Sequence, residues 1–317
     1  MTTATLRATF TLSPLQAGIG FGITAVFMWA SYLVFAQSAI SAGLEPQDIV
    51  VLRFGVAGLI ILPWLLSHDS AHLAGIGWRR GTVLALIAGP LFIILGASGY
   101  VFAPLAHGAV IQPSAIILGG MIAASVFLGE HLTRQKLTGA VVIVLGLVLA
   151  AGFAGSELSI TTTWMGDLMF LGAGSLWAAF TILLKRWRVS GLAATAVVSV
   201  LSAAFVVPAF ALFDGFDRLL ALPVSTLLTQ VIVQGVLAGL IAVIVYGAAV
   251  GRLGAGRSSL FPALVPAVAL VLGFVVTGTV PSVLEITGAT VATVGVLIAL
   301  GVVSIQRFYH RTHGQPS

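Results

Sequence analysis

Long apolar runs, separated by short segments rich in glycine, proline and charged residues, dominate the pattern of this chain. A helix needs about 20 apolar residues to cross the hydrocarbon core of a bilayer. The period-two alternation of half-buried strands is absent, so each run predicts a membrane-spanning helix. We therefore predict an all-α membrane protein with ten transmembrane helices. The predicted spans are residues 16–38, 47–67, 81–103, 108–128, 137–154, 165–185, 192–213, 226–250, 257–277 and 284–305.

The composition supports the same class. Hydrophobic residues make up 59% of the 317 residues and charged residues only 7%, against about 25% charged in ordinary soluble domains. The mean hydropathy is +1.15. There is no cysteine, which excludes disulfides and cysteine-ligated metals. No small-residue cleavage site follows the first apolar run, so we interpret it as a retained span rather than a signal peptide.

Basic residues fall in every second connection between the predicted spans. Because Lys and Arg accumulate in cytoplasmic loops, this asymmetry places both termini in the cytoplasm. Of the 14 Lys and Arg, only Arg218 falls in a loop predicted to face outward, and Arg53 falls inside a span. The net charge of +5 therefore reflects topology and indicates no nucleic-acid partner. The residues predicted to be cytoplasmic are Arg7, Arg79, Arg80, Arg134, Lys136, Lys185, Arg186, Arg188, Arg252, Arg257, Arg307 and Arg311.

The two halves of the chain match at an offset of 149 residues. LGEHLTRQKLTGAVVIVLGLVLA begins at residue 128 and matches TGTVPSVLEITGATVATVGVLIA, while MWASY in the first span matches LWAAF in the sixth. Each half holds five predicted spans, and an odd number makes the second half cross the membrane in the opposite sense. This is the inverted repeat of many secondary transporters. The predicted domains are a cytoplasmic tail 1–15, repeats 16–156 and 157–305, and a cytoplasmic tail 306–317.

Four segments carry a family resemblance: MWASYLVFAQ, VVLRFGVAGLIILP, FLGEHLTRQKLTGAVVIVLG and GDLMFLGAGSLWAAFTILLKRW. With these segments the chain resembles the drug/metabolite transporter superfamily, of the bacterial EamA kind, over nearly its whole length. The resemblance implies a ten-helix bundle around a central cavity, in the inner (plasma) membrane of a bacterium. It also implies export or exchange of small metabolites, often amino acids.

Two tryptophans are candidates for substrate contact. Trp29 and Trp177 are repeat mates near the middle of the first and sixth spans. They either pack simply against neighbouring helices or wall a cavity near the midplane, where inverted-repeat transporters bind substrate. Tyr32 follows Trp29 by three residues, on nearly the same helix face. We predict that these three rings contact substrate.

Arg53 is the only charge well inside a predicted span. Such residues are functional by default, because a charge at the bilayer centre costs about 2.5–3.5 kcal/mol on insertion scales. One interpretation is structural, with the side chain reaching outward to Asp48 or Glu45. The other is a clamp for a carboxylate or phosphate, which suits a planar guanidinium.

Further polar side chains lie in the apolar spans. Gln112 and Gln234 bring amides, and Tyr100 and Tyr246 bring hydroxyls. A buried amide without a partner costs about 2 kcal/mol. Interhelical hydrogen bonds are one explanation and cavity lining is the other. We add these four residues to the predicted substrate contacts.

The segment from Tyr100 to Pro113 interrupts the apolar pattern with two prolines, a histidine and a glutamine. At the offset of 149 it corresponds to residues 249–262, so this joint between spans is built twice, on opposite sides. We predict that the joints form the two rims of a transport pathway, each with a proline early in its helix. The predicted gating residues are His107 and Pro113 outside, and Arg252, Arg257 and Pro262 inside.

Missing motifs narrow the function. Neither GxxxxGK[ST] nor HExxH occurs, so no nucleotide, metal or other cofactor is predicted. All nine Asp and Glu fall at the predicted span ends or in loops, whereas proton-coupled carriers often use intramembrane carboxylates. We therefore expect downhill transport or exchange, or coupling through His107.

These observations favour a secondary transporter, not an enzyme, that exports or exchanges a small amphipathic metabolite such as an amino acid by alternating access. The expected partners are a small-molecule substrate and the lipid bilayer, and the oligomeric state stays open, a monomer included. One alternative is a flippase for a lipid-linked sugar. The other is a membrane-embedded enzyme acting on a lipid intermediate, for which Glu130 and His131 are the only adjacent acid–base pair and lack further partners.

Overall fold

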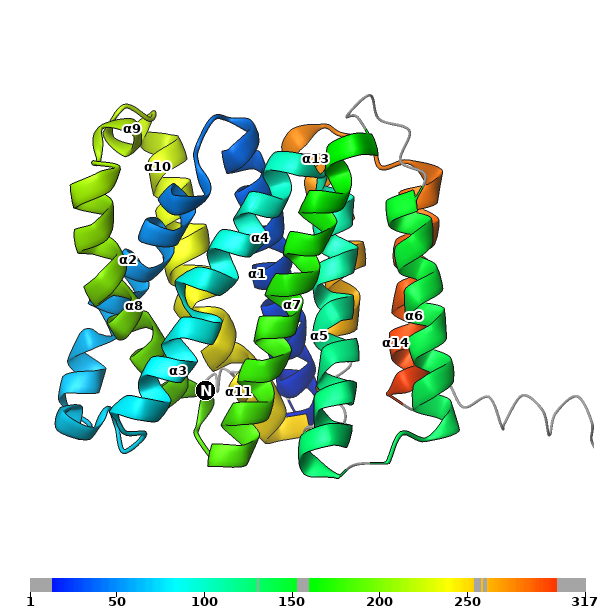
Figure 1. Ribbon diagram of the computed structural model, residues 1–317, viewed down its shortest axis with the longest axis horizontal. Coiled ribbons are helices and arrows are strands. Elements are labelled where there is room, and N and C mark those ends of the chain that lie inside the picture. Colours follow the sequence, from blue (N-terminus) through cyan, green and yellow to red (C-terminus); the bar gives the residue numbers. More distant parts are fainter. Residues whose placement is uncertain (1–12, 130, 153–159, 254–257, 259–260, 301–317) are drawn as a thin grey trace, which may run out of the picture.

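The protein is a bundle of helices in the computed structural model, which describes residues 13–129, 131–152, 160–253, 258 and 261–300 (Figure 1). The predicted tail 306–317 and most of the tail 1–15 lie outside these residues. The first half consists of α1 (Pro14–Ser41), α2 (Pro46–Leu66), η1 (Ser70–His72), α3 (Trp78–Ala88), α4 (Pro90–Phe102), α5 (Leu105–Leu128) and α6 (Arg134–Gly152). The second half consists of α7 (Ile160–Trp187), α8 (Gly191–Phe213), α9 (Asp217–Leu220), α10 (Val224–Gln230), η2 (Val231–Ile241), α11 (Ala242–Leu253), η3 (Phe261–Leu264), α13 (Val265–Thr277) and α14 (Val283–Ala299).

These helices form ten membrane-spanning segments, which confirms the predicted fold class. Seven are long and apolar enough to cross a bilayer by themselves, and 261–277 and 283–299 are shorter apolar helices. The tenth is α6, with 19 residues. Two spans are less regular than the pattern predicts. The third is divided into α3 and α4 at Gly89, where Pro90 starts a new helix, and the eighth contains the π-helical segment η2.

Apart from Arg53 and Arg218, the described Lys and Arg residues gather at one end of the bundle, which we call the basic end. It lies at the bottom of Figure 1, where α3 and α6 begin and α7 and α11 end. The opposite end, called the far end, carries the start of α2 and the short helix α9. The described Lys and Arg residues at the basic end are Arg79, Arg80, Arg134, Lys136, Lys185, Arg186, Arg188 and Arg252.

The last helices of the two halves, α6 and α14, pack against each other with a symmetry that reveals the repeat. A Cβ built on Gly139 would lie 2.5 Å from the backbone nitrogen of Ala299, and one on Gly288 would lie 2.5 Å from that of Ala150. At the offset of 149 these two contacts are the same contact. The start of α6 meets the end of α14, so the helices are antiparallel. The two five-helix repeats are therefore inverted.

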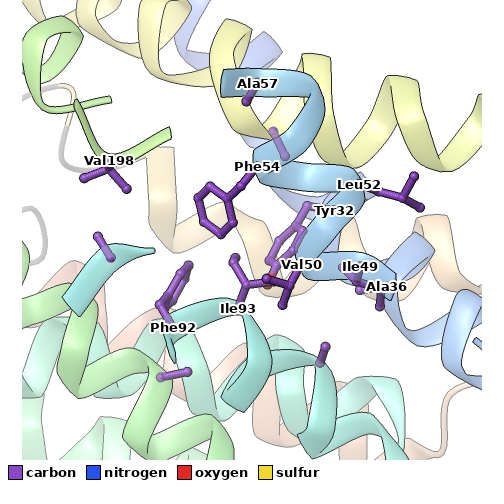
Figure 2. Packing of buried hydrophobic residues seen from close by; sticks show 14 of the residues in the cluster. Tyr32, Ala36, Ile49, Val50, Leu52, Phe54, Ala57, Phe92, Ile93 and Val198 are labelled. Atoms are coloured by element: carbon purple, nitrogen blue, oxygen red, sulfur yellow. The ribbon is translucent and has the colours of Figure 1, made fainter. Parts of the chain in front are cut away.

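The interior lies between the first helices of both repeats. Figure 2 shows Tyr32, Phe54 and Ile93 gathered where α1, α2 and α4 meet. Phe170 of α7 is fully buried against Gly99 of α4, where a Cβ would lie 2.4 Å from its ring. The absence of a side chain at Gly99 thus lets the two repeats approach closely. Polar residues are buried within this same interior.

Candidate substrate-binding site

Tyr32 is the centre of the candidate site. It lies on α1, is 6% exposed, and has the guanidinium carbon of Arg53 at 5.0 Å from its ring centroid. An arginine over an aromatic face is attracted by the ring quadrupole, and the attraction grows when both groups are desolvated. The structure therefore brings together Tyr32 and Arg53, two of the predicted substrate contacts.

Arg53 makes its hydrogen bond across the repeat boundary. Its Nη2 donates to the carbonyl oxygen of Ala238 at 3.3 Å, and its Nη1 is buried without a partner among the described residues. Ala238 lies in η2, and π-helical segments often mark functional positions. The alternative that Arg53 reaches Asp48 or Glu45 is not what the structure shows, because those carboxylates bind Arg218 instead.

Gln112 of α5 and Tyr100 of α4 adjoin the same tyrosine. The hydroxyl of Tyr32 and the amide of Gln112 lie over Gly96, at 3.3 and 3.5 Å from the position of a Cβ built there. The Tyr100 hydroxyl packs on Gly108, where a Cβ would lie 2.6 Å from it. Glycines therefore create the space that these polar ends occupy.

Two amides of the eighth span approach α1 from the other side. Gln230 Nε2 donates to the Phe35 carbonyl at 3.1 Å, and Gln234 Nε2 donates to Gln230 Oε1 at 3.3 Å. The same Gln234 nitrogen lies 3.5 Å from the carbonyl oxygen of Tyr32. Gln230 acts as an interhelical hydrogen-bonding residue. Gln234 does so with its nitrogen, while its oxygen stays unpaired.

The side chains around Tyr32 leave four buried polar atoms without partners in the described part of the chain. Buried polar atoms are nearly always paired, so such a group needs an explanation. The structure gathers them from α2, α4, α5 and η2, and they comprise one donor, two amide acceptors and one hydroxyl. They are Arg53 Nη1, Gln112 Oε1, Gln234 Oε1 and the Tyr100 hydroxyl.

The predicted tryptophans lie beside this group but not in contact with each other. The Trp29 ring packs 5.0 Å from the Tyr246 ring, and the Tyr246 hydroxyl donates to the Ser258 carbonyl at 3.3 Å. The Trp177 ring packs 4.9 Å from Phe92. Both tryptophans are partly buried, and their role as walls of a substrate site stays a prediction.

The predicted rims differ from each other in chemistry. His107 is buried near the start of α5 and bonds Asp167 of α7, with Nδ1 and Oδ1 2.7 Å apart. Arg252 lies at the basic end with its guanidinium carbon 4.7 Å from the Phe21 ring centroid. Arg257 lies outside the described residues, as does Glu130 of the enzyme alternative.

The two predicted gating prolines line the same small cavity. Pro113 and Pro262 line a cavity of about 10 Å³, together with their neighbours one turn later, Ile117 and Pro266. Pro262 is at the start of η3, as expected. Pro113 is not early in its helix, because α5 begins at Leu105. An interior proline cannot donate to the carbonyl four residues earlier, which weakens the helix at that point.

Sequence analysis missed an ionic cluster at the far end. Arg218 of α9 bonds Glu45 at 2.6 Å and Asp48 at 2.8 Å, and Asp48 is fully buried. The hydrogen bond with Asp48 raises the pKa of the Arg218 guanidinium above its ordinary value, and the nearby Glu45 charge adds to it. The signal was present, since Arg218 is the only basic residue in a loop predicted to face outward.

A lateral groove of about 700 Å³ lies between α2, α3, α4 and α8. Its lining is largely apolar, with Gln47 and Asp214 at the far end, where Gln47 Nε2 donates to Asp214 Oδ1 at 3.1 Å. Leu86 and Phe205 on its lining are 61% and 72% exposed. The groove is therefore open to the surroundings of the bundle.

Comparisons with known proteins agree with this architecture. A sequence profile of the EamA-like transporter family matches residues 16–152 and 164–301, one copy on each repeat. The chain is 28% identical over 290 residues to a probable terminal-alkyne amino-acid exporter of Streptantibioticus cattleyicolor, covering 87% of this chain and 91% of the relative. It is 26% identical to the uncharacterized transporter YyaM of Bacillus subtilis, over 92% of this chain and 94% of the relative.

A third relative is an uncharacterized transporter of Archaeoglobus fulgidus, 25% identical over 86% of this chain and 93% of the relative. A solved crystal structure, 20% identical in sequence, superposes with a TM-score of 0.63 over 92% of this chain and 98% of its own. That likeness concerns the fold alone. Together with the two copies of the family profile, the inverted repeats show that this chain is an integral, multi-pass membrane protein of the EamA-like transporter family.

Proposed function

We propose that the protein exports or exchanges a small amphipathic solute of the amino-acid class by alternating access. The observation that carries the proposal is the Arg53 guanidinium, held over the Tyr32 ring with Nη1 buried and unpaired. Arg53 lies seven residues into α2, about 10 Å along the helix from its far end. That depth fits the midplane sites of inverted-repeat transporters.

The unpaired atoms suit a zwitterion. A guanidinium matches a carboxylate through two parallel hydrogen bonds. The amide oxygens of Gln112 and Gln234 are acceptors, and an ammonium group is a donor only. The Trp29 and Trp177 rings, as predicted contacts, would then hold the apolar part of the solute. The name of the Streptantibioticus cattleyicolor relative, a probable amino-acid exporter, supports the same class.

The orientation follows from the charges. We infer that the basic end faces the cytoplasm of a bacterial cell and that both termini lie there, because Lys and Arg accumulate on that side. The far end would then open to the outside. In this arrangement the repeats 16–156 and 157–305 would exchange conformations to expose the Tyr32 cluster to one side at a time.

Counterflow in proteoliposomes tests the proposal. Vesicles loaded with unlabelled phenylalanine should take up labelled phenylalanine, and a thermal-shift screen of metabolites against the purified protein extends the test to other solutes. Arg53→Gln should weaken apparent affinity by about tenfold or more, since a charged hydrogen bond contributes about 1.5–3 kcal/mol. Arg53→Lys should recover only part of it, because an ammonium is a point charge.

Arg80→Gln is the matched control, because Arg80 also lies over an aromatic ring, Trp187, at 5.6 Å but at the basic end. It should leave affinity unchanged. Equal losses in Arg53→Gln and Arg80→Gln would show that Arg53 has no specific role. If no zwitterion in the screen binds or exchanges, the amino-acid class is wrong.

The lateral groove favours a second candidate function, a flippase for a lipid-linked sugar. Its apolar lining would accept acyl chains, while Gln47 and Asp214 lie at the end where a head group would emerge. Phe205→Asp, on the exposed lining, should stop movement of a labelled lipid between leaflets but leave amino-acid counterflow intact. Lipid movement at the rate of protein-free vesicles would exclude this candidate.

A further inference from the structure

The pair of His107 and Asp167 is an unusual feature for the interior of this bundle. The two atoms His107 Nδ1 and Asp167 Oδ1 are 2.7 Å apart, and His107 is only 1% exposed while Asp167 is 25% exposed. Asp167 lies on α7, seven residues after its start at Ile160. The apolar pattern places Asp167 near the end of the predicted span 165–185, and α7 begins five residues before that span, so Asp167 lies about two turns into the helix.

Packing does not require this pair. His107 corresponds to Gly256 at the offset of 149, and Asp167 corresponds to Ile19 at the offset of 148 that matches Trp29 with Trp177. The equivalent joint at the basic end carries Arg252 but no acid–base pair at these two positions. Since burying ionisable groups is costly, the pair at the far end calls for a role other than helix packing.

The geometry of the pair identifies which imidazole nitrogen is free to accept a proton. An ionised carboxylate only accepts hydrogen bonds, so the Nδ1–H of His107 donates to Asp167 and Nε2 holds the lone pair. That Nε2 is buried and has no partner in the part of the chain that the structure describes. An imidazole gains or loses a proton between about pH 5 and 8, and a carboxylate partner balances the charge of its protonated form.

The pair lies next to the candidate substrate site. Gly108, the residue after His107, packs against the Tyr100 ring, and a Cβ built on Gly108 would lie 2.6 Å from the Tyr100 hydroxyl. Gln112 follows His107 by five residues, about 7.5 Å along α5. The ionisable groups on elements packed against α5 are few within the described residues. They are Asp167 beside His107, Tyr100 and Tyr32 toward the site, Glu285 at the far end of α14, and Arg134, Lys136, Lys185 and Arg186 at the basic end.

We propose that His107 and Asp167 form a proton-binding site that couples solute export to proton entry. His107 Nε2 accepts a proton from the far-end solution, which forms its N–H bond and gives an imidazolium balanced by Asp167. The bond breaks again when the proton leaves toward the basic end, after the α5–α7 contact has rearranged. One proton enters for each solute that leaves. This proposal rests on the proposed function and adds its driving force.

Gradient-driven transport separates the two proposals. With the membrane potential clamped, vesicles with an acid interior should accumulate labelled phenylalanine by about tenfold per pH unit, because one pH unit on one proton is about 1.4 kcal/mol. His107→Gln and Asp167→Asn should abolish this accumulation but keep counterflow. Glu285→Gln is the control, since this far-end carboxylate caps α14 through the Ser282 nitrogen. It should leave both assays unchanged.

The outcomes for the two proposals are distinguishable. Counterflow of phenylalanine that is present, together with gradient-driven accumulation that survives in His107→Gln, would overturn the proton site and leave the proposed function standing. Absent counterflow for every solute found in the thermal-shift screen would overturn the proposed function, and the proton site with it, because no solute would then be coupled.

Discussion

The packing of α6 on α14 gives a prediction whose size follows from the structure. A Cβ on Gly146 would lie 2.4 Å from the backbone nitrogen of Ala292, which is 1.0 Å short of the 3.4 Å of ordinary contact. The obstacle is backbone, so no side-chain rotation relieves it. In Gly146→Ala the two helices must separate, or the helix must bend, to admit one methyl group.

The expected cost combines two opposing effects. Forcing an extra methyl group into a tight contact costs about 1–3 kcal/mol, while replacing a helical glycine with alanine returns up to about 1 kcal/mol. We therefore expect a net loss of about 1–2 kcal/mol. At about 2–4 °C per kcal/mol, the melting temperature in detergent should fall by several degrees, measured by tryptophan fluorescence.

The repeat supplies a second variant and the chain supplies a control. Gly295 is the mate of Gly146, and a Cβ there would lie 2.6 Å from the backbone nitrogen of Ile143. Gly295→Ala should therefore cost a similar amount. Gly120 of α5 has nothing within 4 Å of a built Cβ, so Gly120→Ala should be neutral or stabilising. Equal melting temperatures for Gly146→Ala and Gly120→Ala would refute the close packing, and a large difference between Gly146→Ala and Gly295→Ala would refute the symmetric interface.

Three further predictions concern the polar interior and its far end. Arg218→Gln removes the partner of the fully buried Asp48. Breaking a buried pair costs about 3–5 kcal/mol, and less here because Arg218 is 34% exposed. The melting temperature in detergent should therefore fall clearly, and the fall should persist in high salt. Gly96→Ala places a methyl group 3.3 Å from the Tyr32 hydroxyl, so solute affinity in a thermal-shift titration should fall while the melting temperature without solute stays within a few degrees. Trp29→Ala and Trp177→Ala should each weaken binding of the solutes found in that screen, and unchanged affinity in both would remove the tryptophans from the site.

The topology was accessible from sequence because it depends on length, charge and repetition. Ten apolar runs, one-sided basic residues and the recurrence of Gly139 and Gly146 as Gly288 and Gly295 each reflect a constraint along the chain itself. Interruptions were harder to predict. Gly89 and Pro90 lie inside an apolar run that looks continuous, and hydropathy does not record a change of backbone direction.

The pairing of polar residues could not be read from the sequence. Tyr32, Arg53 and Gln112 stand out in the sequence as polar or aromatic positions in apolar spans, but their convergence is a property of how helices distant in sequence pack. Asp167 was placed at a span end because the apolar run begins only two residues before it, whereas α7 begins at Ile160.

The two repeats share a scaffold but not its chemistry. At corresponding positions Tyr32 is Phe180, Tyr100 is Ala249 and Gln112 is Phe261, so the second repeat is apolar where the first carries the candidate site. The tight glycine contacts, in contrast, recur in both halves. Symmetry is therefore retained where helices touch and lost where polar groups gather.

This division has a consequence for the transport cycle. Two far-end ion pairs join one repeat to the other: α2 to α9 through Asp48 and Arg218, and α5 to α7 through His107 and Asp167. An opening of the far end between the repeats must break these pairs. Leaving Asp48 or Asp167 buried without its partner is costly, so the open state needs water or a proton to satisfy them. Opening of the far end therefore depends on the ionisation of these carboxylates, and under the proposed function this is the end where the solute leaves.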